Sequence, residues 1–346
     1  MQLIAPSFRC PNNPQGFDRL RSETLDALQD ILGSPPFSDP PPLNPRVIYT
    51  SDDRAYWRKK VRYGNESDDV VWAWLLVPKD ADAATPLPAV ICLPGTFMTP
   101  NWGKDGPAGL AGPENAGDPE AYGADLARLG YITLCPDYPC SGERTSPGLK
   151  SHDTAELDRR FPTWTRVGLS AWDVSRAVDY LLTIPEVDPA RIGCTGWSQG
   201  GEMSVLGAAL DSRISAVASV CGWSPLRNQS EAIVDNLTRS YNFPRLRRYA
   251  ESGESLSFDL DWVAACIAPR PFLDVRAGHD RYFANRDDIT HATSEIREVY
   301  ALLGARGCFM PYTFSGDHAH NAHAARETQA WFHRWLWPEP DRMVGL

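Results

Sequence analysis

A glycine-rich segment around one serine carries the strongest chemical signal in the chain. Ser198 lies within residues 196–201 (GWSQGG), after a strand-like run at 191–195 and before a helix-like segment at 200–210. A G-x-S-x-G pattern between a strand and a helix is typical of a nucleophile elbow, whose tight turn exposes the serine hydroxyl. Glycines are needed there because a Cβ would collide with the adjacent strand or helix. We therefore predict that Ser198 is a nucleophile.

A nucleophilic serine needs a base to take its proton and a carboxylate to orient that base. Asp280 follows the strand-like run 271–275, and His318 follows the last such run, 309–314, after a Gly-Asp turn. On a sheet in which strands alternate with helices, this chemistry uses the chain order serine, acid, histidine. Each partner of the serine then lies in a loop after a later strand. The sequence therefore predicts a triad of Ser198, Asp280 and His318.

Other side chains compete for the two partner roles. Asp274 lies inside its strand, whereas Asp287 and Asp288 fall later, in an expected helix. His320 and His323 also follow the last strand, but His318 comes directly after the turn and is preferred.

The same loop holds four side chains of metal-ligating type: Asp317, His318, His320 and His323. Their spacing matches no known zinc pattern, and adjacent loop residues rarely converge on one ion. We therefore predict no metal and no organic cofactor.

Acyl transfer also needs donors for the negatively charged oxygen of its intermediate. The backbone N–H of Gln199, after the nucleophile, should be one, and the N–H of Thr96, after the strand-like run 88–93, should be the other. Nearby aromatic residues make Phe97, Trp197 and Trp223 candidates for substrate binding, although packing in the core explains each of them equally well.

Buried strands alternate with amphipathic helices from residue 88 onward. The expected strands are 88–93, 131–135, 191–196, 214–221, 271–275 and 309–314, and the expected helices include 119–129, 168–182 and 200–210. Two further strands, 56–63 and 70–77, precede them. This rhythm predicts an α/β fold with a mostly parallel central sheet and helices on both faces.

Two segments lie outside this alternation. Residues 1–45 read as a helix (17–32) and a proline-rich lead-in, packed against a catalytic domain at 46–346. Residues 226–262 separate two core strands and contain helix-like pieces, which predicts a small cap insertion.

Composition narrows the class of protein. The 346 residues include 34 Lys and Arg against 44 Asp and Glu, a net charge of −10 that disfavours nucleic acid and anionic membrane surfaces as partners. The longest apolar run, 70–77, is too short to span a bilayer, and residues 1–13 lack a signal-peptide pattern. Eight cysteines without a C-x-x-C pair predict reduced, structural thiols in a cytoplasmic protein. The oligomeric state is left open, a homo-oligomer included.

The run 188–201 (DPARIGCTGWSQGG) resembles the α/β-hydrolase superfamily, and within it the dienelactone-hydrolase-like and acetyl xylan esterase-like branch. Supporting similarity lies in segments 129–131, 135–139, 142–144, 172–181 and 268–271. The chain departs from that branch at Ser198, where dienelactone hydrolases carry cysteine, and at Pro94, where relatives often carry histidine. Ala319 replaces the glutamate typical of one group of acetyl xylan esterases, and Trp197 is unusually bulky for an elbow.

The resemblance implies an α/β-hydrolase fold and a serine esterase that cleaves a carboxylic ester with a small or medium acyl group. A small-molecule ester would then be the partner. The alternatives are a lyase, cyclase or acyltransferase on the same scaffold, a small peptidase, or a binding module without catalysis. A peptidase with a propeller is disfavoured because only 87 residues precede the strand at 88.

Overall fold

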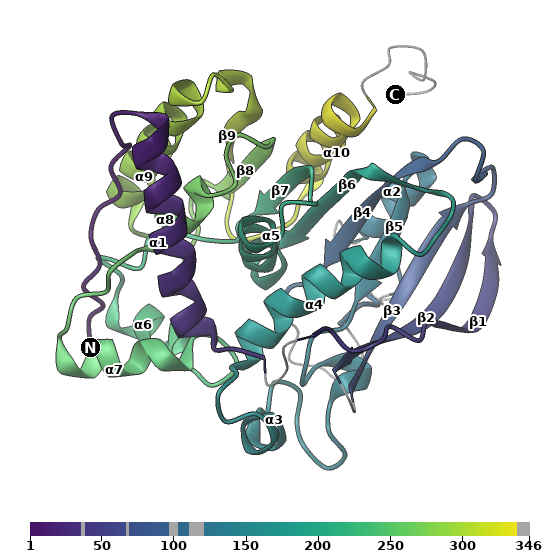
Figure 1. Ribbon diagram of the computed structural model, residues 1–346, viewed down its shortest axis with the longest axis horizontal. Helices are drawn as coiled ribbons and strands as arrows, with labels where there is room; N and C mark the ends of the chain where they lie inside the picture. Colours follow the sequence, from purple (N-terminus) through teal and green to yellow (C-terminus); the bar gives the residue numbers. More distant parts are fainter. Residues whose placement is uncertain (36–38, 67–68, 97–102, 111–120, 338–346) are drawn as a thin grey trace.

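A nine-stranded sheet forms the centre of the molecule (Figure 1). The computed structural model describes the chain except residues 36–38, 67–68, 97–102, 111–120 and 338–346, and the side chains of 65–66. The strand order is β1-β2-β3-β5-β4-β6-β7-β8-β9. Pairing is antiparallel from β1 to β5 and parallel from β5 to β9, which confirms the expected mostly parallel α/β-hydrolase sheet.

The strand bounds follow the buried apolar runs closely. They are β1 Arg46–Asp53, β2 Tyr56–Glu66, β3 Asp69–Pro78, β4 Leu87–Leu93, β5 Ile132–Pro136, β6 Val187–Trp197, β7 Ala216–Val220, β8 Phe272–Ala277 and β9 Phe309–Phe314. β1 was not predicted, because it is an edge strand whose Val47, Ile48 and Tyr49 are exposed and carry no buried pattern.

Ten α-helices are described. They are α1 Pro14–Leu32, α2 Tyr122–Arg128, α3 Ala155–Arg160, α4 Arg166–Leu181, α5 Gln199–Leu210, α6 Glu231–Leu237, α7 Arg247–Ser252, α8 Leu260–Ala265, α9 Arg286–Leu302 and α10 Ala322–Leu336. Three short 3-10 turns add to them: Gly142–Arg144, Pro244–Leu246 and Arg306–Cys308. No helix in the described part of the chain is long and apolar enough to cross a membrane.

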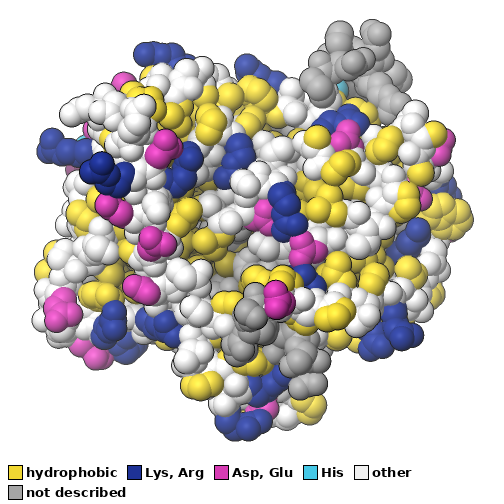
Figure 2. Space-filling view, viewed as in Figure 1, with side chains coloured by type: hydrophobic (Ala, Val, Ile, Leu, Met, Phe, Trp, Pro, Cys, Tyr) yellow, Lys and Arg dark blue, Asp and Glu magenta, His cyan; other side chains and the backbone are white. Residues whose placement is uncertain are grey.

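The two faces of the sheet bury separate cores, because successive side chains of a strand point in opposite directions. In β4, Ile91 packs in the core that includes buried residues of α1, α4, α5, α8 and α9, whereas Val90 packs in the core under α2 and α10. Helices therefore cover both faces, as expected. On the surface shown in Figure 2, acidic and basic side chains are interspersed outside the grey residues, with no extended patch of one sign.

The N-terminal segment joins the larger of these cores. Asn13 caps α1 by accepting a hydrogen bond from the N–H of Gly16, and Phe17, Leu28 and Ile31 are buried in the common core. The sequence predicted that α1 begins at residue 17, three residues after its observed start at Pro14. The boundary at 45/46 between a lead-in and a catalytic domain stays a prediction.

Candidate active site

Ser198 occupies a strained turn between β6 and α5. Its backbone has φ 56° and ψ −121°, a conformation rare for residues with a side chain. A Cβ on Gly196 would lie 2.4 Å from the carbonyl carbon of Gly200, and one on Gly200 would lie 2.1 Å from the carbonyl oxygen of Leu93. The glycines are thus required by the close approach of β4 and α5, as the pattern predicted.

The acid and base loops are joined to each other at the ends of β8 and β9. The N–H of Gly278 donates to the carbonyl of Phe314 at 2.9 Å, and that of His279 donates to the carbonyl of Gly316 at 2.8 Å. These backbone bonds continue the parallel pairing of β8 and β9 and bring two loops, about 40 residues apart in the chain, to one place.

The three residues of the predicted triad form one hydrogen-bonded chain. Ser198 Oγ lies 2.9 Å from His318 Nε2, and His318 Nδ1 lies 2.8 Å from Asp280 Oδ2. The other oxygen of Asp280 accepts the N–H of Tyr282 at 2.9 Å, which fixes the carboxylate. The side chains of His318 and Asp280 are 7% and 4% exposed, so solvent screens their interaction little.

Aromatic rings hold the imidazole of His318 from three directions. The ring centroids of Trp197, Tyr282 and Phe283 lie 5.4, 4.8 and 5.8 Å from that of His318. Tyr282 and Phe283 approach edge-on, at 74° and 60°. Packing of this kind restricts ring rotation and keeps Nε2 directed at the serine hydroxyl.

The two backbone groups expected to stabilise an oxyanion border the same cavity. Thr96 and Gln199 both line the cavity that contains Ser198. The N–H of Gln199 is the first of α5, and neither N–H donates a hydrogen bond to another described residue. An unpaired N–H at a helix N-terminus favours negative charge nearby, so this geometry is suited to an oxyanion.

The cavity has a volume of about 310 Å³ and is bounded on one side by α6 and the turn after it. Its lining includes Thr96, Trp197, Ser198, Gln199, Glu202, Gly222, Ile233, Asn236, Leu237, Tyr241, Asn242, Tyr282, Phe283 and His318. The lining residues that come from α6 and the turn after it were not identified individually from the sequence. The expected cap at 226–262 was the only signal that could have indicated them.

Glu202 is a titratable residue of this cavity that the sequence did not single out. It lies one helical turn after Ser198 in α5, where its N–H donates to the carbonyl of Ser198 at 3.0 Å, but its carboxyl group makes no hydrogen bond to any described residue. Burial raises the pKa of Glu202 to about 8, and the positive charge of Arg166 offsets only part of this effect. Glu202 therefore keeps its proton at neutral pH and offers a hydrogen-bond donor as well as an acceptor.

The three expected substrate-binding aromatics have separate positions. Trp197 lines the cavity. Trp223 does not, which corrects its expected place: it is 2% exposed and its ring packs under the guanidinium of Arg276 at 4.3 Å. The reason is its contact with Arg276, whose guanidinium lies over the indole and whose Nη1 donates to the carbonyl of Trp223 at 2.9 Å. Phe97 lies outside the described residues.

The side chains that competed for roles in the loop after β9 are engaged elsewhere. Asp317 pairs with Arg281, His320 is buried against the ring of Tyr122, and His323 Nδ1 lies 3.0 Å from Arg326. Two of the competing acids are also engaged with other side chains: Asp274 pairs with Arg276, and Asp288 pairs with Arg227. The four residues of the metal alternative therefore do not gather at one point.

One group with metal-binding geometry occurs in the described part of the chain, at Cys221, Asp280 and His318, whose ligand atoms lie within 4.8 Å of one another. Burial raises the pKa of the Cys221 thiol to about 12, so the sulfur stays protonated at neutral pH. Because metals bind the thiolate and His318 already bonds Asp280, these residues fit a triad better than a metal centre.

A family model described as "Glucuronyl esterase, fungi" matches residues 167–304. Among curated relatives, YtaP of Bacillus subtilis, named as a hydrolase, is 28% identical over 221 residues, which are 62% of this chain and 69% of that protein. Five further curated relatives match over 23% to 53% of their lengths, so the chain spans about half or less of those proteins.

Solved structures show the same fold over nearly the whole chain. A glucuronoyl esterase from Solibacter usitatus superposes with a TM-score of 0.72 at 18% identity, covering 96% of this chain and 98% of that one. A Bacteroides fragilis protein named as an acetyl xylan esterase superposes with a TM-score of 0.66 at 21% identity, covering 90% and 79%.

Proposed function

We propose that this chain is a serine esterase of the α/β-hydrolase superfamily and that it hydrolyses carboxylic esters through Ser198, His318 and Asp280; its similarity to glucuronoyl esterases and to YtaP supports the proposal. The observation that carries the proposal is the unbroken chain of two hydrogen bonds, 2.9 and 2.8 Å long, from the serine hydroxyl to the buried carboxylate.

The proposed mechanism follows from these contacts. His318 Nε2 takes the proton of Ser198 as Oγ attacks the ester carbonyl carbon, and Asp280 stabilises the imidazolium that forms. Collapse of the tetrahedral intermediate transfers that proton to the leaving alcohol and leaves an acyl-enzyme. Water then attacks the acyl carbon by the same route, with His318 again as base, and releases the acid. The N–H groups of Thr96 and Gln199 would bind the oxyanion in both steps.

We propose that the acyl group belongs to a sugar acid. The cavity is lined by neutral polar groups, the protonated Glu202 carboxyl and the amides of Asn236 and Asn242, and by no Lys or Arg among its described lining residues. An esterified uronic acid carries no charge and many hydroxyl groups, so this lining matches it. A volume of about 310 Å³ is at the lower end of the roughly 300–1,000 Å³ typical of ligand sites. The names of the relatives support the same substrate class.

The experiment compares two substrates, the methyl ester of glucuronic acid and p-nitrophenyl acetate, with the wild type, Ser198→Ala and the exposed control Ser252→Ala. We expect the wild type and Ser252→Ala to hydrolyse both esters, and Ser198→Ala to lose at least about 10³-fold in kcat. EDTA should leave the rate unchanged.

The two parts of the proposal fail in different ways. A Ser198→Ala enzyme with wild-type turnover would overturn the triad. Hydrolysis of p-nitrophenyl acetate without hydrolysis of the glucuronate ester would overturn only the sugar-acid substrate.

We further propose that the enzyme works in the cytoplasm. All eight cysteines are free, and six of them are buried, which suits a reducing compartment. Titration with a thiol reagent on the denatured protein, isolated under conditions that block exchange, should find eight reduced thiols. Recovery of oxidised pairs would contradict this location.

A further inference from the structure

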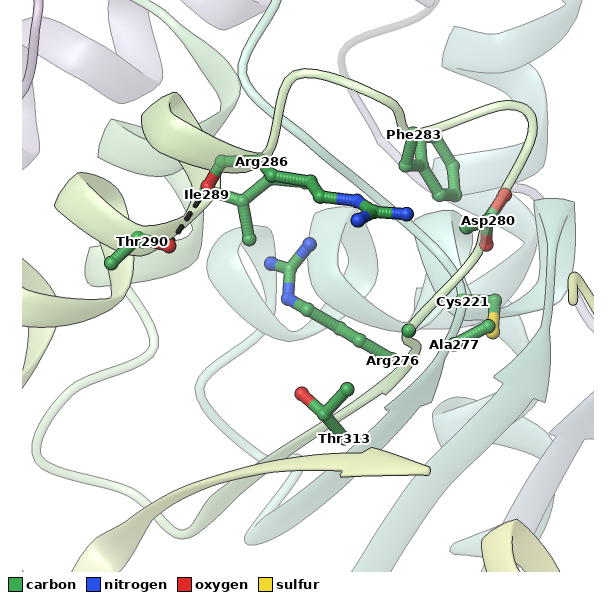
Figure 3. A pocket seen from close by; sticks show the side chains of 10 residues that line it. Cys221, Arg276, Ala277, Asp280, Phe283, Arg286, Ile289, Thr290 and Thr313 are labelled. Carbon is green, nitrogen blue, oxygen red and sulfur yellow. Dashed lines mark hydrogen bonds between the residues drawn. The ribbon is translucent and has the colours of Figure 1, made fainter. Parts of the chain in front are cut away.

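A second cavity lies beside the catalytic one, between the end of β8 and the start of α9. It has a volume of about 190 Å³, and Phe283 lines both cavities, so its ring stands between them. Figure 3 shows that two arginine side chains, Arg276 from β8 and Arg286 from α9, extend into this space. The proposed reaction uses neither of them.

One guanidinium nitrogen of Arg276 has no hydrogen-bond partner among the described residues. Its Nε donates to Asp274 at 2.7 Å, and its Nη1 donates to the carbonyl of Trp223 at 2.9 Å. Its side chain is 11% exposed, and the buried Nη2 has no hydrogen-bond partner. A buried donor without an acceptor is unfavourable, so a ligand that supplies one would be stabilised there.

Arg286 provides the second positive charge from the opposite wall. Its guanidinium is solvent-exposed and lies 3.3 Å, from Nη2 to Nδ1, from His279, and no acidic side chain among the described residues pairs with it. Two guanidinium groups in one small cavity repel each other unless an anion lies between them. Thr313 adds a hydroxyl group to the same lining, whereas the hydroxyl of Thr290 already donates to the carbonyl of Arg286 at 2.9 Å.

One carboxylate also borders the cavity, but it is already occupied. Asp280 binds His318 with one oxygen and the N–H of Tyr282 with the other. Asp280 therefore leaves the free Nη2 of Arg276 and the guanidinium of Arg286 without a hydrogen-bonded carboxylate, although it balances part of their charge.

We propose that this cavity is a binding site for a small oxyanion, a carboxylate or a phosphate, held by Nη2 of Arg276 and the guanidinium of Arg286. Both anions present paired oxygens that match the fork of an arginine side chain. The source would be either the acid released by ester hydrolysis or inorganic phosphate. The cavity borders the catalytic residues at Asp280 and Phe283, but the proposed binding uses only the two arginines, so its test does not depend on catalysis.

Calorimetric titration tests the site with sodium phosphate, sodium acetate and sodium glucuronate at constant ionic strength. The proteins are the wild type, Arg286→Gln and a matched control, Arg297→Gln, which removes the same charge from an exposed position on the same helix. We expect saturable binding of at least one anion to the wild type and to Arg297→Gln, and at least tenfold weaker binding to Arg286→Gln.

Arg276→Gln should weaken binding as well, but it also breaks the contact with buried Asp274, so Arg286→Gln carries the test. Tighter binding of phosphate would identify phosphate as the ligand, and tighter binding of glucuronate or acetate would identify the product acid. Equal affinity of the wild type and Arg286→Gln, or no saturable binding of any of the three anions, would overturn the site.

Discussion

Replacement of Gly200 by alanine should damage the oxyanion site more than the fold. A Cβ at this position would lie 2.1 Å from the carbonyl oxygen of Leu93 and 2.9 Å from that of Pro94. Ordinary contact begins near 3.4 Å, so α5 and the end of β4 must separate by about 1.3 Å, the difference between 3.4 and 2.1 Å. The displaced segment leads directly to Thr96, which lines the same cavity as Ser198.

The size of the effect follows from that displacement. Misplacing a reacting group by about 1 Å costs roughly 10²-fold in rate, so we expect kcat/KM to fall by about that factor. Overpacking costs about 1–3 kcal/mol of unfolding free energy. Glycine to alanine within a helix otherwise stabilises by about 1 kcal/mol, so a net loss of stability would itself show that the contact with β4 is real.

The assay is hydrolysis of p-nitrophenyl acetate together with urea unfolding. The matched control is Gly307→Ala, where the nearest atom to a new Cβ is Arg334 Nη2 at 3.7 Å and which should behave as the wild type. Wild-type kcat/KM and unaltered stability in Gly200→Ala would refute the argument that β4 and the elbow are in close contact.

Two further predictions concern buried acids. Burial raises the pKa of Glu202 to about 8, so its carboxyl group becomes charged above that pH. KM for the glucuronate ester should therefore rise above pH 8 in the wild type and stay flat in Glu202→Gln. Identical KM profiles of the two proteins from pH 6 to 9 would contradict the contact of Glu202 with substrate. Arg227 pairs with Asp259 and Asp261, both fully buried, so Arg227→Leu should lose about 3–5 kcal/mol of stability at pH 8. Burial raises the pKa of Asp259 to about 7, so at lower pH this carboxyl group is protonated and its unpaired charge disappears. Urea unfolding should therefore show that Arg227→Leu loses less stability at pH 5.5 than at pH 8. An equal or larger loss of stability at pH 5.5 would count against the prediction.

The sequence by itself determined the elements whose pattern is local. The turn 196–201 is specified by its own glycines, because only they tolerate the approach of α5 to β4. β9 was predicted at its observed bounds, and the strands that position Asp280 and His318 were predicted to within a few residues, because each is a short apolar run bounded by turn residues. β1 and α3 were not predicted, since an exposed edge strand and a six-residue helix leave little pattern.

The tertiary structure alone decided what surrounds that site. Burial raises the pKa of Glu202 to about 8 and the charge of Arg166, 36 residues earlier in the chain, offsets part of that effect, so no local pattern encodes this pKa. Trp223 packs under Arg276 rather than in the cavity, because that arginine, from a separate strand, contacts its ring and binds its carbonyl. Arg276 and Arg286 share a cavity only because α9 folds back beside the end of β8. Sequence patterns specify periodicity and turns, whereas the distances between side chains from separate elements are set by packing.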